Sequence, residues 1–320
     1  MKILITGATG LVGQAIVKAL IRKKIPINYL TTSKDKIVSS KNYNGFYWNP
    51  DKDECDRNAF NGVTAVINLA GATISKKWTN AYKKTIINSR INSLQTLKKG
   101  IQNSNNHHIQ TFVSASAIGI YPSSPTMLYE ENEEAIDDSF LGEVVAVWEN
   151  EIDSFNSFDF KVSKIRIGLV LSDEGGALPK IAQPVNNYVG AAFGDGLQWQ
   201  SWIHIHDLAQ IFLFVLEHQL EGTFNGVAPN PVTNEKLTKA VAKALNKPIL
   251  LPNIPKFMMK LILGEMAYLL FASQRVSSKR IEKKGFTFKH KNICNALESI
   301  YNTTSATQNP VEPTYEETFS

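Results

Sequence analysis

Residues 1–30, MKILITGATGLVGQAIVKALIRKKIPINYL, predict a strand, a glycine-rich turn, a helix and a second strand in direct succession. Lys2–Ile5 form a short apolar run, and Leu11–Arg22 repeat apolar side chains at helical spacing. Between them the chain reads G-x-x-G-x-x-G from residue 7. This order of strand, glycine turn and amphipathic helix is typical of a dinucleotide-binding βαβ unit.

Each glycine of this turn has a separate predicted task. Gly7 permits the tight exit from the strand, Gly10 lets main-chain N–H groups approach a pyrophosphate, and Gly13 lets the helix pack close to the sheet. The positive end of the helix dipole adds attraction for phosphate. The alternative is a glycine turn that only packs. The predicted cofactor contacts in this segment are Gly7, Thr9, Gly10, Leu11, Val12 and Gly13.

The end of the second predicted strand decides between NAD and NADP. An acidic residue at this place would bind the ribose 2′-hydroxyl of NAD and repel a 2′-phosphate. The chain has Thr32, Ser33 and Lys34 there, and the first carboxylate is Asp35. Hydroxyl and ammonium groups favour NADP(H), with NAD(H) as the alternative. A solvated loop with surface lysines is the other interpretation.

Apolar strands and helices alternate along the first two-thirds of the chain. This pattern predicts an α/β fold, a doubly wound parallel sheet of Rossmann type with a smaller C-terminal α/β lobe. The predicted strands are 27–31, 45–48, 63–69, 111–116, 161–171 and 223–227, and the predicted helices are 79–101, 139–154, 233–245 and 256–272.

The predicted domain organisation follows from the composition along the chain. Residues 1–174 form the nucleotide-binding domain, to which the chain returns at 201–228. Residues 175–200 and 229–301 form a smaller substrate or lid lobe, because Gly and Pro interrupt the alternation there. The polar segment 302–320 is predicted to be a frayed tail.

Composition narrows the function classes. Among 320 residues the net charge is +5, but Lys and Arg are dispersed, so we expect no nucleic-acid partner. Cys55 and Cys294 are too few and too far apart for a disulfide framework or a metal knuckle, which indicates the cytoplasm. Lys260 and Glu265 interrupt the longest apolar run, so we expect no membrane partner. The expected partner is a small molecule, and the expected state is a monomer or homodimer.

Four motifs in a fixed order give the chain a family resemblance. They are GATGLVG at 7–13, Asn68–Gly71, Ser114–Tyr121 and Ser201–Asp207. The chain thereby resembles the atypical, extended short-chain dehydrogenase/reductases, in the epimerase-family branch of putative nucleoside-diphosphate-sugar epimerases with a small C-terminal domain of uncharacterised function. The resemblance covers Met1–Leu297. It implies a Rossmann-type domain with a lobe closing over the substrate, and cofactor contacts at Leu69, Ala70, Gly71 and Ser114.

The catalytic dyad of that larger family does not match this chain. Short-chain dehydrogenases usually carry Y-x-x-x-K on the helix after the fifth strand. Counting back from Trp148 and Glu149, the corresponding positions are Leu141 and Val145, neither of which transfers a proton. An ordinary Tyr–Lys mechanism is therefore excluded.

Two other hydroxyl groups follow the fifth strand. By position Ser116 resembles the family's substrate-binding serine, and Tyr121 is the one phenol able to act as acid/base. We therefore predict both as catalytic residues. The alternatives are a small residue packing at the strand end for Ser116, and an aromatic lid over the nicotinamide for Tyr121, because a phenol of pKa about 10 needs an activator.

Candidate substrate contacts lie elsewhere in the chain. Arg90 resembles the branch's S-R element and presents a guanidinium suited to a carboxylate or phosphate. Lys83 lies seven residues earlier on the same helical face, and Trp202 offers an aromatic wall. A surface position for Arg90 and core packing for Trp202 are the alternatives.

Two histidines raise the question of a metal. We expect His204 and His206 to alternate on one strand and Asp207 to cap the following helix. Because no third ligand stands at useful spacing, we expect no metal.

The combined expectation is an NADP(H)-binding oxidoreductase or epimerase acting on a small polar substrate such as a sugar derivative. The alternative is a non-catalytic NADPH-binding redox sensor, which Leu141 and Val145 favour.

Overall fold

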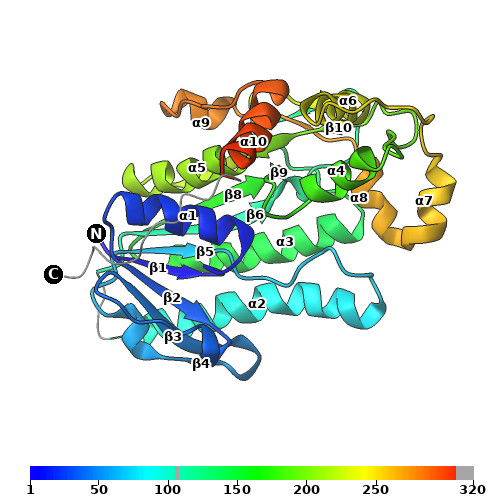
Figure 1. Ribbon diagram of the computed structural model, residues 1–320. Coiled ribbons are helices and arrows are strands. Elements are labelled where there is room, and N and C mark those ends of the chain that lie inside the picture. The colour runs from blue at the N-terminus through cyan, green and yellow to red at the C-terminus, as the bar shows by residue number, and fades with distance from the viewer. Residues whose placement is uncertain (105–107, 308–320) are drawn as a thin grey trace.

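The computed structural model describes residues 1–104 and 108–307, with the backbone only for 303–307, and it is built on one eight-stranded sheet (Figure 1). The strand order is β12-β8-β6-β5-β1-β2-β3-β4, and neighbouring strands are parallel except for β3 and β4. The predicted doubly wound parallel sheet is confirmed. The strands are β1 Ile3–Thr6, β2 Ile27–Thr31, β3 Tyr43–Asn49, β4 Glu54–Cys55, β5 Ala65–Asn68, β6 Thr111–Ala117, β8 Lys161–Ile167 and β12 Gly222–Gly226.

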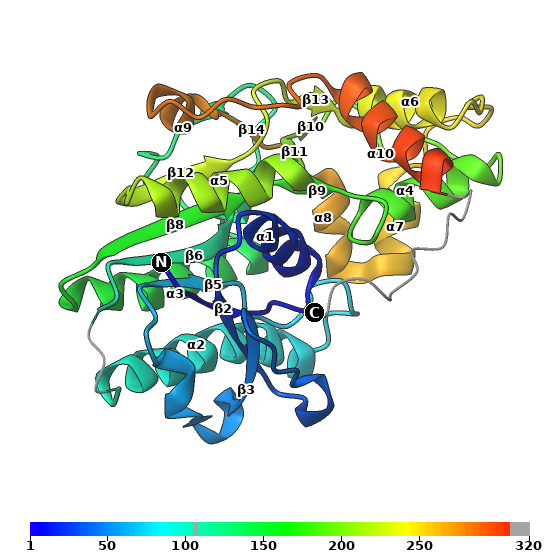
Figure 2. The same ribbon diagram turned by 60° about the vertical axis from the view of Figure 1, so that its left-hand side comes forward.

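Four helices cover the two faces of this sheet (Figure 2). Helices α1 (Leu11–Arg22) and α5 (Ile205–Glu217) pack together on one face, and α2 (Asn80–Gln102) and α3 (Phe140–Asp153) on the other. The central strand β1 is buried at every residue, as a parallel strand covered on both faces must be. The parallel strands of the sheet all end at the same edge, and this edge holds the candidate site.

The predicted strand 161–171 is two strands, because Gly168 interrupts it. A Cβ at Gly168 would overlap the carbonyl oxygen of Ser201, so the close approach of the two backbones requires glycine. Beyond this point β9 (Leu169–Leu171) leaves the main sheet and pairs in parallel with β11 (Trp202–His204).

The C-terminal part of the chain forms a smaller lobe above the sheet (Figure 1). Its helix α4 was not predicted from the sequence, and its strands β10 and β13 pair antiparallel. Helix α10 continues to Thr307, beyond the start of the predicted tail at 302, and residues 308–320 lie outside the described residues. The remaining bounds are α4 Leu178–Asn186, β10 Trp199–Gln200, β13 Val232–Thr233, α6 Asn234–Ala244, α9 Lys279–Lys283 and α10 Ile293–Thr307.

The predicted single helix 256–272 is broken at Gly264. Helix α7 (Lys256–Leu263) ends there, a 3-10 turn follows, and α8 (Tyr268–Phe271) resumes. Gly264 has φ +58° and ψ −134°, a conformation that residues with a Cβ rarely adopt. The segment α7–α8 thus forms an arm with a bend.

A short strand pair joins the lobe to the main domain. Strand β7 (Leu128–Tyr129) pairs in parallel with β14 (Arg275–Val276). Beside it, Gln274 Nε2 donates to the carbonyl oxygen of Tyr121 at 2.5 Å. Among the described residues, no helix combines the length and apolar character needed to cross a bilayer.

Candidate functional site

The glycine turn lies at the carboxyl end of β1 and fits a dinucleotide. Gly7 has φ +68°, and a Cβ there would lie 2.9 Å from the carbonyl oxygen of Leu69. A Cβ at Gly13 would overlap the carbonyl oxygen of Gly7. The N-cap residue of helix α1 is Gly10, which supplies no side-chain cap, and the first turn of the helix has no acidic residue. Its N-terminal N–H groups therefore remain for an anionic ligand.

A buried chain of hydrogen bonds fixes the neighbouring loop. Thr6 Oγ1 donates to Asn68 Oδ1 at 2.7 Å, and Asn68 Nδ2 donates to Ser114 Oγ at 3.0 Å. Thr6 Oγ1 also accepts the N–H groups of Leu69 and Ala70. These bonds join β1, β5 and β6 at the edge where the cofactor would lie.

Ser114 lies between neighbouring strands at this edge. Its side chain is fully buried, and its hydroxyl is held between Asn68 and the carbonyl oxygen of Ala115. The hydroxyl group thus links β5 to β6, and the cofactor contact of Ser114 stays a prediction.

The residues after β2 are accessible. Thr32 and Lys34 are exposed, Ser33 is half-buried, and the Ser33 N–H donates to Thr31 Oγ1 at 3.2 Å. The Lys34 Nζ lies 5.1 Å from the ring centre of Tyr47. Because β2 is the parallel neighbour of β1, this segment follows the same sheet edge as the glycine turn.

A pocket of about 220 Å³ opens at the carboxyl ends of β6 and β8. Leu141 and Val145, which occupy the dyad positions, both line it, so apolar side chains stand where a proton donor is usual. Arg90 is the one charged side chain of this lining. The other lining residues are Ile74, Ala117, Ile118, Gly119, Val144, Trp148, Ile167, Gly168, Leu169, Trp199, Gln200, Ser201, Leu269, Ala272 and Gln274.

Arg90 lines this pocket and also contacts the loop after β5. Its Cζ is 4.8 Å from the ring centre of Trp148, and a Cβ at Gly71 would lie 3.3 Å from it. Nη1 donates to the carbonyl oxygens of Ala72 and Ile86, at 3.3 and 2.8 Å. Burial lowers the pKa of the guanidinium to about 10, which leaves it charged at neutral pH.

Two N–H groups of the pocket lining have no hydrogen-bond partner. They are Arg90 Nε and Trp148 Nε1, both enclosed although the Arg90 side chain as a whole is only partly buried. Within the described part of the chain no carboxylate forms an ion pair with Arg90. Unsatisfied enclosed donors are uncommon in folded proteins.

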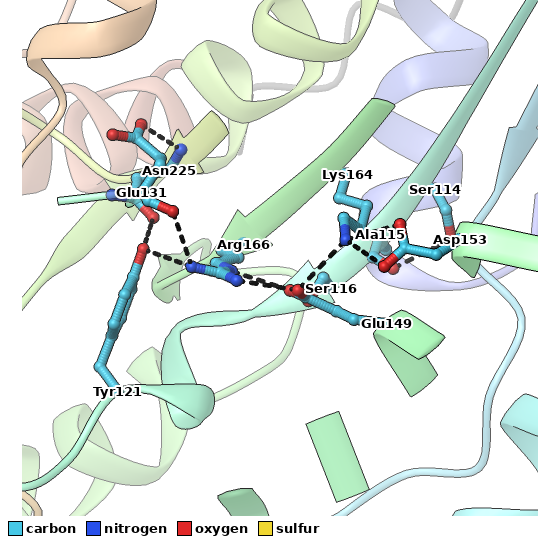
Figure 3. A network of polar contacts seen from close by, with 10 residues as sticks. All are labelled: Ser114, Ala115, Ser116, Tyr121, Glu131, Glu149, Asp153, Lys164, Arg166 and Asn225. Atoms are coloured by element: carbon cyan, nitrogen blue, oxygen red, sulfur yellow. Dashed lines mark hydrogen bonds and ion pairs between the residues drawn. The ribbon is translucent and has the colours of Figure 1, made fainter. Parts of the chain in front are cut away.

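Behind the pocket, a network of polar side chains fills the space between β6, β8 and α3 (Figure 3). Arg166 donates through Nε and Nη2 to the two carboxylate oxygens of Glu149, each at 2.8 Å. Burial opposes both charges, but the mutual hydrogen bonds and attraction lower the pKa of Glu149 and raise the pKa of Arg166. Ser116 Oγ donates to Glu149 Oε1 at 2.5 Å.

Tyr121 closes the other end of this network (Figure 3). Its hydroxyl donates to Asn225 Oδ1 at 2.8 Å and accepts from Arg166 Nη1 at 2.9 Å. The side chain is fully buried, and burial raises the pKa of the phenol. Glu131 is also buried, and its carboxylate accepts the Asn225 N–H.

Neither Ser116 nor Tyr121 is part of the pocket lining. Both hydroxyl groups already have partners within the protein, which contrasts with the predicted catalytic roles. Their catalytic assignment stays a prediction that the geometry does not favour.

Lys83 and Trp202 also lie away from the Arg90 pocket. Lys83 forms an ion pair with Glu265 of the lobe and lies 4.9 Å from the ring centre of Phe140, so it does not join Arg90 in one anion site. Trp202 is fully buried and donates to the carbonyl oxygen of Asn230 at 2.9 Å. This position agrees with the alternative of core packing, whereas Trp199 lines the pocket.

A larger pocket of about 500 Å³ lies between the start of α3 and the α7–α8 arm. Trp78 and Phe140 contribute aromatic surface, and Lys256 and Lys260 contribute positive charge. Arm residues Leu269 and Ala272 reach the Arg90 pocket, so the arm borders both pockets.

A separate cluster of histidines lies at the start of α5. His204 caps this helix by accepting the His206 N–H, so His206 lies on the helix and not on the predicted strand. Asp207 does not cap the helix; its carboxylate accepts the N–H groups of Lys289 and His290. Burial lowers the pKa of His204 to about 4.

The fold and this edge of the sheet define a Rossmann-type, NAD(P)-binding protein whose dyad positions are apolar. Comparison with known proteins supports this class of protein. The model described as "NAD dependent epimerase/dehydratase family" matches residues 3–141, and "Domain of unknown function (DUF1731)" matches residues 254–300. An epimerase family protein of Staphylococcus aureus is 37% identical over 298 residues, which cover 93% of this chain and 98% of that protein. The chain therefore belongs to the NAD-dependent epimerase/dehydratase family, among its epimerase family proteins.

Solved structures agree with this assignment. The human epimerase family protein SDR39U1, determined with NADPH, superposes with a TM-score of 0.83 at 25% identity, over 94% of this chain and 99% of that one. A nucleoside-diphosphate sugar epimerase from Corynebacterium glutamicum gives a TM-score of 0.74 at 28% identity, over 94% of this chain and 58% of that one.

Proposed function

We propose that this protein is an NADP(H)-dependent oxidoreductase that acts on a small carbonyl or alcohol substrate with an apolar body. The observation that carries the proposal is the pair of unpartnered N–H groups, Arg90 Nε and Trp148 Nε1, on two residues that line a mostly apolar pocket next to the loop after β5. A sugar would leave many hydroxyl groups unpaired against such walls. The substrate class is therefore narrower than the polar, sugar-like one that the sequence suggested.

Residues at the sheet edge would hold the cofactor. Gly7, Gly10 and Gly13 admit its pyrophosphate, and the exposed Lys34 with Thr32 would receive a 2′-phosphate. The NADPH in the human relative supports this preference. When bound, the dinucleotide supplies or accepts a hydride.

Arg90 and Trp148 would orient the substrate oxygen by donating hydrogen bonds to it. A charge-assisted bond from the guanidinium stabilises an oxygen that gains negative charge during reduction. Leu141 and Val145 line the pocket and cannot donate a proton, so the reduction would take the proton for that oxygen from solvent water. Ser116 and Tyr121 then position the strands through the Arg166–Glu149 network instead of contacting substrate.

The same apolar dyad positions favour a second candidate, an NADPH-binding sensor without turnover. Nicotinamide fluorescence separates the candidates when NADPH and NADH are titrated and oxidation is then followed with a panel of aryl ketones, aromatic 2-oxo acids and nucleotide sugars. Oxidation with the aryl compounds alone supports the oxidoreductase. Tight NADPH binding with no oxidation supports the sensor, and binding of neither nucleotide contradicts both.

A further inference from the structure

The histidine cluster at the start of α5 includes a third potential metal ligand that sequence spacing conceals. His206 and Asp207 are consecutive on α5, and His290 comes from the loop between α9 and α10. One ligand atom from each of the three lies within 4.8 Å of the other two. The expectation of no metal depended on the lack of a third ligand, and the fold supplies one from 83 residues further along the chain.

We propose that His206, Asp207 and His290 form a binding site for one divalent transition-metal ion of the zinc type. Two imidazoles and one carboxylate are a donor set that suits Zn²⁺ and leaves a fourth position for water. Mg²⁺ and Ca²⁺ prefer sites made mainly of oxygen ligands. The proposal is independent of the oxidoreductase assignment, because none of these three residues lines the Arg90 pocket.

The spacing of the donor atoms suits a tetrahedral ion. His206 Nδ1 lies 3.5 Å from Asp207 Oδ1. In a tetrahedral zinc site with bonds of about 2.1 Å, neighbouring donor atoms are about 3.4 Å apart. The three donor atoms lie within 4.8 Å of one another, so each separation must shorten by at most roughly 1.4 Å, a movement within reach of rotations of the half-exposed His206 side chain. This exposure also gives an ion a path to the site.

The surrounding contacts hold two of the ligands in place before any ion binds. The Asp207 carboxylate accepts the N–H groups of Lys289 at 3.2 Å and His290 at 2.7 Å, which fixes the loop against the helix. The His290 ring stacks on His204 at a centroid distance of 3.8 Å. Ser299 Oγ lies 3.4 Å from His290 Nδ1, the kind of outer contact that orients ligating histidines.

Bound metal would join the main domain to the C-terminal segment, since α5 covers the sheet and His290 lies in the loop that leads into α10 (Figure 1). An ion that binds only the folded state raises its stability by mass action. We therefore infer a stabilising site with an open coordination position, separate from the cofactor.

Metal binding to the untagged full-length protein tests the proposal. After EDTA treatment, Zn²⁺ is measured by equilibrium dialysis and Co²⁺ by its visible d–d absorption. We expect one ion per chain, a d–d spectrum of four-coordinate intensity, and a Tm that rises with Zn²⁺. His206→Asn and His290→Asn should each weaken binding by more than about 100-fold, since loss of outer contacts alone costs 10–100-fold.

His218→Asn is the matched control, because His218 is an exposed histidine next to the end of the same helix. It should leave affinity and spectrum unchanged. His206 is half-exposed, so its variant is expected to fold, and circular dichroism checks this. Absence of binding to the wild type, or equal binding by His206→Asn and His290→Asn, overturns the proposal. Equal loss in His218→Asn overturns it as well.

Discussion

Arg166 binds both carboxylate oxygens of Glu149 at 2.8 Å, in a place where neither side chain is more than 8% exposed. The pair joins β8 to α3, the helix that presents Leu141 and Val145 to the pocket. We therefore expect the Arg166–Glu149 ion pair to maintain both the shape of the Arg90 pocket and the stability of the fold.

Glu149→Gln should lower the free energy of unfolding by about 3–5 kcal/mol at pH 7, because it leaves a buried guanidinium without its counter-charge. The folded-state pKa of Glu149 is lowered, so its contribution is complete above the unfolded pKa of about 4.3 and is lost as pH falls through the folded pKa. The difference in unfolding free energy between variant and wild type, measured by urea unfolding, should thus become smaller below about pH 4. Glu143→Gln, an exposed site on the same helix, should change stability by less than about 1 kcal/mol.

Arg90→Met tests the proposed substrate contact. The variant loses the donor but removes a partly buried charge without a carboxylate partner, so the unfolding free energy should change by less than about 1 kcal/mol. NADPH affinity should be retained, whereas binding or turnover of an accepted carbonyl compound should fall about 10–150-fold, the equivalent of about 1.5–3 kcal/mol. Arg57→Met at an exposed site is the control. Loss of NADPH binding instead would assign Arg90 to the cofactor.

Lys34→Glu tests the cofactor preference. Lys34 is exposed, so the Tm should be unchanged, while repulsion of the 2′-phosphate should weaken NADPH binding by about 10–100-fold and leave NADH binding unaffected. Lys41→Glu makes the same charge change at an exposed position before β3 and should affect neither nucleotide. An equal loss for NADH and NADPH would contradict a 2′-phosphate contact.

Tyr121→Phe separates a structural role from a catalytic one. Removal of the hydroxyl leaves Asn225 and Arg166 each with one partner fewer, so we expect a loss of about 1–2 kcal/mol of stability and an unchanged kcat. Loss of a general acid would lower kcat about 100-fold or more. Tyr129→Phe is the matched control, because the Tyr129 ring stacks on the Tyr121 ring at a centroid distance of 5.3 Å. A large kcat loss in Tyr121→Phe alone would restore the catalytic assignment.

The sequence predicted the parts of this molecule that local patterns encode. The glycine turn, strand β2 and the helices after β5 and β6 follow from glycine spacing and hydrophobic periodicity, and the structure has them within two residues of the predicted bounds. The apolar dyad positions Leu141 and Val145 were also identified by position, and both line the pocket.

The sequence was less informative where contacts between residues far apart in the chain determine the structure. Gly168 splits a strand because the backbone of Ser201 passes next to it, and no local pattern reports that neighbour. A sequence also does not show that Glu149 and Asn225 accept the hydroxyl groups of Ser116 and Tyr121, whose catalytic roles stay predictions. His290 was missed for the same reason, since it approaches His206 only through the fold.

The short β7–β14 pair has a consequence for motion. The hydrogen bond from Gln274 to Tyr121 and the strand pairing beside it attach the lobe to the loop that follows β6. A hinge movement of the whole lobe would break these bonds, whereas α7 can pivot about Gly264, where the chain bends before α8. We therefore expect ligands to enter by displacement of α7, with β7 and β14 remaining paired.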